Sequence, residues 1–161
     1  MEQENGAIMS ANAKLLGGKS WTAYFSIGLA AILLLAILAP LAWYGSWIAG
    51  VAVLALALPF FAYQILLVRS YKLYCDEVGV WVYSGILPWK KGVKGVKWRD
   101  LDEALYFQTF GSWLFNSYSI RIGHRFTKSS EIFLTNMARG NESAIAINAH
   151  LHELVRNNAL A

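Results

Sequence analysis

Two short stretches of the sequence carry residue types that hold phosphate or metal in other proteins. LLGGKS, at residues 15–20, ends like a phosphate-binding loop, in which glycine amides and a lysine hold a nucleotide. That loop needs a glycine where this chain has Ala13, and no strand pattern precedes it, so we expect a flexible basic flank here. HLHELVR, at residues 150–156, begins like a zinc-binding helix, but Arg156 stands where the second histidine is needed. We expect neither stretch to bind its ligand.

A third stretch, PWKKGVKGVKWRD at residues 88–100, holds five of the chain's fourteen Lys and Arg residues. Three explanations are open. The charges are solvated and protect an exposed strand edge, they contact anionic lipid headgroups, or they meet an acidic patch on a protein partner. Nucleic acid is less favoured, because no second basic segment or set of stacking aromatics is evident. The candidate lipid- or partner-binding residues are Lys90, Lys91, Lys94, Lys97 and Arg99, with the flanking Trp89 and Trp98.

The sequence contains no pattern typical of a catalytic site. It has no carboxylate pair, no Ser-His-Asp order and no glycine-rich nucleotide fingerprint. The single cysteine, Cys75, cannot form an internal disulfide, and we expect it to be a small apolar strand residue rather than a nucleophile. We therefore expect no enzymatic activity, no cofactor and no bound metal.

An uncharged block before the basic stretch has the right length for two membrane helices. Residues 21–68 contain no Asp, Glu, Lys or Arg. A helix needs about 20 apolar residues to cross a hydrocarbon core of ~30 Å, and residues 21–44 and 47–68 both satisfy this, with a Gly-Ser turn between them. The absence of charge within the spans argues against a transporter or pump. Aromatic residues stand where membrane interfaces are expected, at Trp21, Trp43, Tyr44 and Trp47.

The charges that flank this block predict its orientation. Lys14 and Lys19 precede the first span, whereas Arg69 and Lys72 follow the second, and positive flanks stay on the cytoplasmic side. We therefore expect a multi-pass protein with both termini in the cytoplasm. The expected parts are an N-terminal tail (1–20), two transmembrane helices (21–69) and a cytoplasmic domain (70–161).

Short runs rich in Val, Ile and aromatic residues follow the block and indicate about six strands. In SYSIRI, Tyr118, Ile120 and Ile122 alternate with polar residues, which predicts an antiparallel strand with one buried face. A helix over residues 143–158, capped by Ser143 or Asn141, carries an apolar stripe at Ile147, Leu151, Leu154 and Val155. These elements predict an α+β domain, with a bent antiparallel sheet or partly open barrel covered by the C-terminal helix.

The chain resembles bacterial pleckstrin-homology-like (PH-like) domains that follow a pair of membrane helices. The resemblance covers residues 20–160 and rests on an SGIL step (84–87), WRDL (98–101), a glycine- and leucine-containing loop (111–115) and SYSIRI (117–122). It implies a bent seven-stranded sheet capped by a C-terminal helix. Phosphoinositide binding does not follow, because a fold does not imply a function and bacterial membranes generally lack those lipids.

Taken together, these patterns predict a non-catalytic protein of the bacterial inner membrane. We expect its PH-like domain to serve as a scaffold or accessory subunit of a membrane complex, with another membrane protein or a second copy as partner. The alternative is a module that binds or senses anionic lipid without a protein partner.

Overall fold

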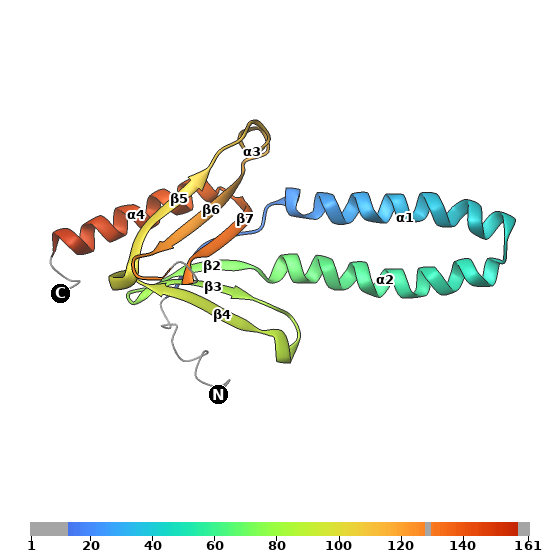
Figure 1. Ribbon diagram of the computed structural model, residues 1–161, viewed down its shortest axis with the longest axis horizontal. Coiled ribbons are helices and arrows are strands. Elements are labelled where there is room, and N and C mark those ends of the chain that lie inside the picture. Colours follow the sequence, from blue (N-terminus) through green and yellow to red (C-terminus); the bar gives the residue numbers. More distant parts are fainter. Residues whose placement is uncertain (1–12, 128–129, 158–161) are drawn as a thin grey trace.

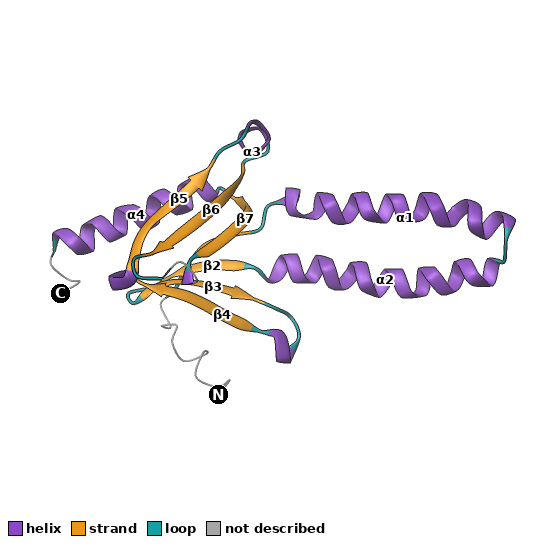
Figure 2. Cartoon of the chain, in the orientation of Figure 1, coloured by secondary structure: helices purple, strands orange, loops and turns teal. Residues whose placement is uncertain are grey.

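An antiparallel helical hairpin extends from one end of a domain made of two antiparallel sheets and a C-terminal helix (Figure 1). The computed structural model describes residues 13–127 and 130–157. The chain is therefore an α+β protein, as the sequence predicts. Figure 2 shows the strands gathered at one end of the molecule and the two long helices at the other.

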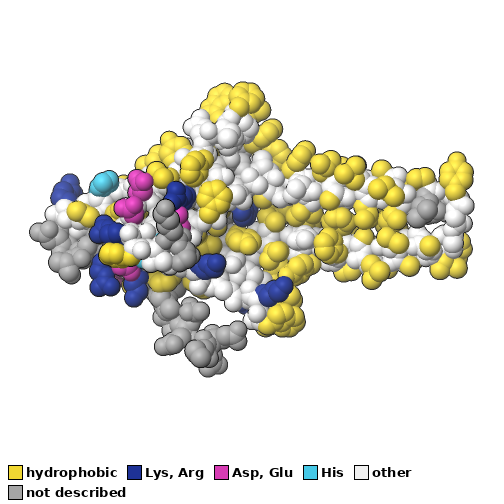
Figure 3. Space-filling model, viewed as in Figure 1, with side chains coloured by type: hydrophobic (Ala, Val, Ile, Leu, Met, Phe, Trp, Pro, Cys, Tyr) yellow, Lys and Arg dark blue, Asp and Glu magenta, His cyan; other side chains and the backbone are white. Residues whose placement is uncertain are grey.

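The hairpin consists of α1 (Phe25–Tyr44) and α2 (Trp47–Ser70), and a short 3-10 helix, η1 (Trp21–Tyr24), leads into α1. Both segments are long and apolar enough to cross a membrane. The 24 residues of α2 span about 36 Å at ~1.5 Å per residue. The predicted turn at residues 45–46 is confirmed, and α2 continues two residues beyond its predicted end. Many large apolar side chains of both helices are exposed, and Figure 3 shows them along one face of the hairpin.

The first sheet includes a strand that precedes the hairpin in the chain. β1 (Lys14–Gly18) pairs antiparallel with β2 (Lys72–Cys75), and the sheet continues through β3 (Gly79–Ser84) to β4 (Gly92–Lys97). The hairpin is thus an insertion between two neighbouring strands. Our expectation of a flexible flank at residues 15–20 is wrong, because residues 14–18 (KLLGG) form a strand that pairs with β2. The sequence does not indicate this strand, since KLLGG lacks the alternation of apolar and polar residues. The part of the predicted tail at residues 1–12 lies outside the described residues.

The second sheet has the order β5-β6-β7, formed by β5 (Leu101–Phe107), β6 (Ser117–His124) and β7 (Ile132–Ala138). A short helix, α3 (Phe110–Leu114), lies between β5 and β6. The sheets meet where β1 approaches β7, through a bridge between Lys19 and Met137. The alternation predicted for β6 is confirmed, since Tyr118, Ile120 and Ile122 are all buried.

The C-terminal helix α4 (Gly140–Arg156) packs on the second sheet and closes the core. Ile147 and Leu151 are buried, whereas Val155, which we placed on the same stripe, is exposed. The Asn148 side chain accepts a hydrogen bond from the Ala104 amide and donates one to its carbonyl, both at 2.8 Å. This amide therefore fixes α4 to the edge of β5.

The start of α4 differs from the sequence prediction in position and in capping. The helix begins at Gly140, and its N-cap is Arg139, whose backbone is left-handed at φ 51°. The Ser143 hydroxyl donates to the Leu16 carbonyl of β1 at 3.2 Å. The capping role predicted for Ser143 or Asn141 is wrong, because both residues lie inside the helix. The predicted end at residue 158 lies outside the described residues.

A tryptophan on the outer face of the first sheet requires a glycine opposite it. Trp81 pairs with Gly95, and a Cβ at Gly95 would overlap the indole ring. The ring cannot move freely, because its N–H donates to the Asp76 carboxylate at 2.8 Å. The close approach therefore fixes residue 95 as glycine.

We predict that Gly95→Ala lowers the free energy of unfolding by about 1–3 kcal/mol, the usual cost of overpacking. Thermal unfolding of the detergent-purified full-length protein, followed by tryptophan fluorescence, measures this loss. Gly92→Ala in the same strand is the matched control, since a Cβ there meets no atom within 4 Å. Equal stability of the two variants would contradict the packing described here.

Candidate functional site

The five cations of the basic stretch do not form one surface. β4 runs away from the hairpin, so Lys90 and Lys91 lie near the hairpin base while Lys97 and Arg99 lie at the far end (Figure 1). Six residues of strand cover about 20 Å at ~3.3 Å each. This exceeds twice the Debye length of ~8 Å at physiological salt. A charged surface at the hairpin base therefore attracts the first pair and not the second.

The side chains of two of these lysines also lie on opposite faces of the first sheet. Lys94 pairs with Val82, which belongs to the core, whereas Lys97 pairs with Gly79 on the register of the outer face. Cross-strand partners point to the same side of a sheet. Lys94 and Lys97 thus protrude from the edge of β4 in different directions. This arrangement fits the protection of an exposed strand edge better than one binding surface.

Trp98 is a core residue, which corrects its place in the predicted site. It is 2% exposed, and its indole N–H donates to the Asp76 carbonyl at 2.8 Å. The Asp76 carboxylate accepts from the amides of Val78 and Gly79, both at 2.9 Å, so this turn holds Trp98 inside the domain. Trp89, by contrast, is 71% exposed and remains available for contact.

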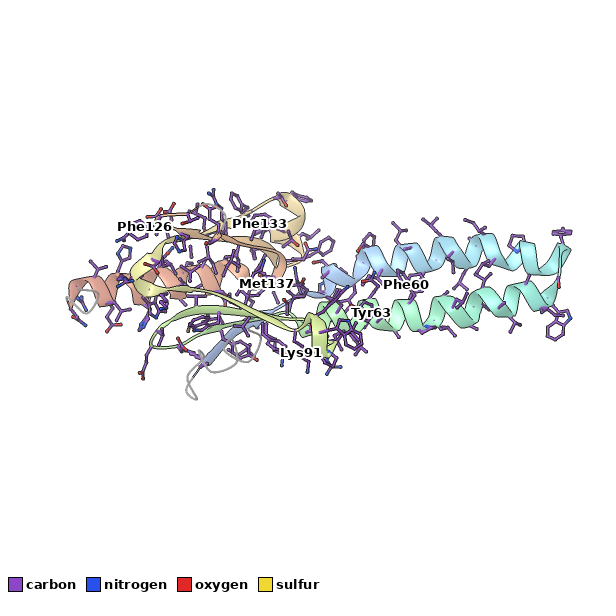
Figure 4. All side chains as sticks on the ribbon, turned by 60° about the horizontal axis from the view of Figure 1, so that its bottom comes forward. Phe60, Tyr63, Lys91, Phe126, Phe133 and Met137 are labelled. Carbon is purple, nitrogen blue, oxygen red and sulfur yellow. The ribbon has the colours of Figure 1, made fainter. Side chains whose placement is uncertain are left out.

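A basic cavity lies where α2 meets the outer face of the first sheet. We call it the junction pocket; its volume is about 480 Å³. Figure 4 shows one of its residues, Lys91, at the base of the hairpin. The lining combines cations, hydroxyl groups and apolar side chains: Leu66, Arg69, Ser70, Lys72, Tyr74, Tyr83, Gly85, Ile86 and Lys91.

Three separate elements bring the pocket cations together. Arg69 occupies the last turn of α2, and Lys72 lies at the start of β2, where it pairs with Tyr83 of β3. Lys91 follows the short 3-10 helix η2 (Pro88–Lys90) that connects β3 to β4. In the sequence, Arg69 and Lys72 indicate only the orientation of the hairpin. Their proximity to Lys91 depends on the return of the chain after β3.

Hydrogen bonds and backbone geometry fix the wall of the pocket. The Ser70 hydroxyl donates to the Leu67 carbonyl at 2.7 Å and accepts from the Gly85 amide at 3.0 Å. Gly85 has φ +106°, and a Cβ there would overlap the Lys90 carbonyl. Only glycine fits this turn without strain. The turn that carries Lys91 is therefore fastened to the end of α2.

The charge of the junction pocket suits an anion. Among the described residues, none of its three cations forms an ion pair, and no Asp or Glu lines it. Arginine offers a planar fork of donors to a phosphate, and lysine adds compact positive charge. Leu66 and Ile86 provide an apolar wall beside these donors. The pocket thus suits an anionic ligand with an apolar portion.

The described residues offer little for acid–base or metal chemistry. No three or more His, Cys, Asp or Glu side chains among them lie close enough to hold a metal ion. Cys75 and His150 line a second cavity of about 360 Å³ between β2 and α4. Burial raises the pKa of the Cys75 thiol, and the charge of Asp76 adds to this effect while Lys14 partly opposes it. A protonated thiol is a poor nucleophile.

Comparisons with protein-family models, curated proteins and solved structures found no match to this chain.

We predict that Cys75 reacts with iodoacetamide several-fold more slowly in the folded protein than after denaturation in SDS. Its raised pKa lowers the thiolate fraction at pH 7–8, and partial burial limits access. The folded-state rate should still be rising at a pH where the denatured thiol has reached its plateau. Mass spectrometry of the alkylated protein measures both rates. Equal rates at pH 7.5 would show that Cys75 is an accessible, reactive thiol.

Proposed function

We propose that this protein is a non-catalytic integral membrane protein that binds the phosphate of an anionic lipid in its junction pocket. The hairpin crosses the bilayer, and the domain lies directly beneath it. The observation that carries the proposal is the position of three uncompensated cations at the level where the apolar surface of the hairpin ends. Lipid headgroups lie at that level in any membrane that the hairpin spans.

The chemistry of the hairpin surface supports the membrane assignment. Large apolar side chains are exposed along both helices, and Leu56 and Ile37 are 76% and 68% exposed. Exposed apolar surface of this extent is unfavourable in water and is covered by lipid tails in a bilayer. The positive flanks favour a cytoplasmic domain. We propose on this basis that both termini are cytoplasmic, and the resemblance of the sequence to bacterial PH-like proteins leads us to propose the bacterial inner membrane as its location.

The number of strands and the C-terminal helix support a PH-like assignment for the domain. The described residues form seven strands, arranged as four and three, followed by a C-terminal helix. This is the number of strands and the final helix that the resemblance of the sequence implies. In this chain, however, one strand precedes the hairpin, so the domain is not simply appended after two membrane helices.

Electrostatics favours lipid in the junction pocket. Each Lys or Arg near an anionic membrane surface contributes about 1 kcal/mol, so three cations contribute roughly 3 kcal/mol, equivalent to about a hundredfold in affinity. The apolar wall at Leu66 and Ile86 continues from the side of α2. A lipid acyl chain can follow α2 while its phosphate accepts hydrogen bonds from Arg69, Lys72 and Lys91.

We predict that the full-length protein, in micelles doped with equal amounts of phosphatidylglycerol and phosphatidylcholine, retains an excess of phosphatidylglycerol. The combined variant Arg69→Gln, Lys72→Gln and Lys91→Gln should lose that excess, because the pocket then carries no charge. Native mass spectrometry counts the bound lipids.

The matched control removes three cations of the basic stretch that do not line the pocket, through Lys94→Gln, Lys97→Gln and Arg99→Gln. It changes the net charge equally and should retain the lipid preference. Equal binding of the two lipids by the natural protein would contradict the proposal, as would an equal loss in both variants.

A second candidate, the scaffold or accessory subunit, is favoured by the free edge of β4. Within the described part of the chain, no strand pairs with this edge. An exposed edge accepts a strand from another protein. A stoichiometric membrane protein that copurifies with the natural protein, but not with the variant changed at residues 94, 97 and 99, would place this function first.

A further inference from the structure

An apolar cluster protrudes from the domain at the connection between β5 and β6. We call it the α3 tip; its members are Phe110, Trp113, Leu114 and Phe115, which are 77%, 59%, 56% and 45% exposed. Figure 3 shows hydrophobic side chains gathered at the outer end of the α3 loop. This loop projects from the domain beside the start of the hairpin (Figure 1). Soluble surfaces rarely expose a contiguous apolar cluster without a partner.

Local hydrogen bonds hold the α3 tip in a defined conformation. Thr109 and Ser112 form a reciprocal cap, in which the Ser112 amide donates to the Thr109 hydroxyl at 3.2 Å. The chain then turns back into β6 through Asn116, whose φ is 51°. A stable turn of helix therefore presents the aromatic rings outward.

The α3 tip is attached to the beginning of the first apolar span. The Phe115 ring packs edge-on against Trp21, with centroids 5.1 Å apart and an interplanar angle of 84°. Trp21 is the first residue of the charge-free block, and the neighbouring Thr22 hydroxyl is hydrogen-bonded to the hydroxyl of Ser117. The tip consequently lies at the same depth as the start of the hairpin.

A second exposed aromatic residue lies on the other side of the hairpin. The turn between β3 and β4 carries Trp89, and it reaches the hairpin base opposite α3 (Figure 1). Lys90 and Lys91 follow Trp89 directly. Tryptophan favours the interfacial layer of a bilayer, where its ring is buried and its N–H remains near water. Neighbouring lysines favour anionic headgroups.

We infer that the α3 tip and the Trp89 turn insert into the headgroup–acyl boundary of the bilayer, on opposite sides of the hairpin. This inference rests on the proposed membrane function. The occupant is lipid because the cluster continues the apolar surface of the hairpin through the Phe115–Trp21 contact. With the hairpin, two inserted points fix the tilt of the domain, and the junction pocket on the Trp89 side faces the headgroups.

Site-specific labelling of the full-length protein tests the inference. In a Cys75→Ser background, Phe110→Cys and Trp113→Cys each receive an NBD fluorophore, and the proteins are reconstituted in phosphatidylglycerol–phosphatidylethanolamine vesicles. Phe126→Cys is the matched control, because Phe126 is 74% exposed but lies at the end of the domain far from the hairpin (Figure 4). Leu56→Cys, within α2, reports on the hairpin itself.

NBD at residues 110 and 113 should show blue-shifted emission and be quenched more by lipids with a shallow spin label than by lipids with a deep one. The label at 56 should show the reverse depth order, and the label at 126 should not be quenched. Water-exposed, unquenched labels at 110 and 113, with a quenched label at 56, would overturn the inference and leave the hairpin assignment standing. Blue-shifted but unquenched labels would also overturn it, since a protein contact would then cover the tip. An unquenched label at 56 would instead reject the membrane function.

Discussion

The pairing of β1 with β2 determines where the rest of the molecule lies. The chain enters the hairpin from β1 and returns into β2, and paired strands are only about 4.8 Å apart. Both ends of the hairpin are therefore held by the same sheet. The Ser20 amide adds a 2.7 Å hydrogen bond to the Asn136 carbonyl of β7, and the Ser70 hydroxyl joins α2 to the turn at Gly85. The domain is thus clamped to the hairpin at its entry and at its exit, without a linker.

This attachment at two points fixes which surfaces of the domain lie around the hairpin base. A domain on a flexible linker could turn any face toward the hairpin, whereas this clamped domain holds the junction pocket and the α3 tip beside the hairpin base. The two surfaces also differ in chemistry: the pocket gathers Arg69, Lys72 and Lys91, while the tip is apolar. Cations suit headgroups and aromatic rings suit the layer beneath them. The free edge of β4 extends away from the hairpin, which leaves it open to a protein partner.

Features that depend on a local residue pattern can be predicted from the sequence, whereas features that depend on contacts between distant segments of the chain cannot. A long charge-free block predicts two helices, and alternation predicts which residues of β6 are buried. β1 was missed because its partner lies beyond the hairpin and its own five residues show no alternation. Trp89 and Trp98 occupy similar positions beside the lysines in the sequence. Only Trp98 is buried in the core, where its indole N–H donates a hydrogen bond to the Asp76 carbonyl. The junction pocket could not be predicted, since Lys91 meets Arg69 and Lys72 only after β3 reverses the chain.

We propose that the hairpin crosses a membrane and leaves the domain on one side, and chemical labelling from each side of the membrane distinguishes this arrangement from its alternatives. In a Cys75→Ser background, Ser46→Cys marks the turn between α1 and α2, and Arg125→Cys marks the domain; both positions are exposed. A membrane-impermeant maleimide is applied to sealed vesicles of either orientation. We expect labelling of residue 125 only from the cytoplasmic face and labelling of residue 46 only from the opposite face. Labelling of both residues from the same face would contradict it.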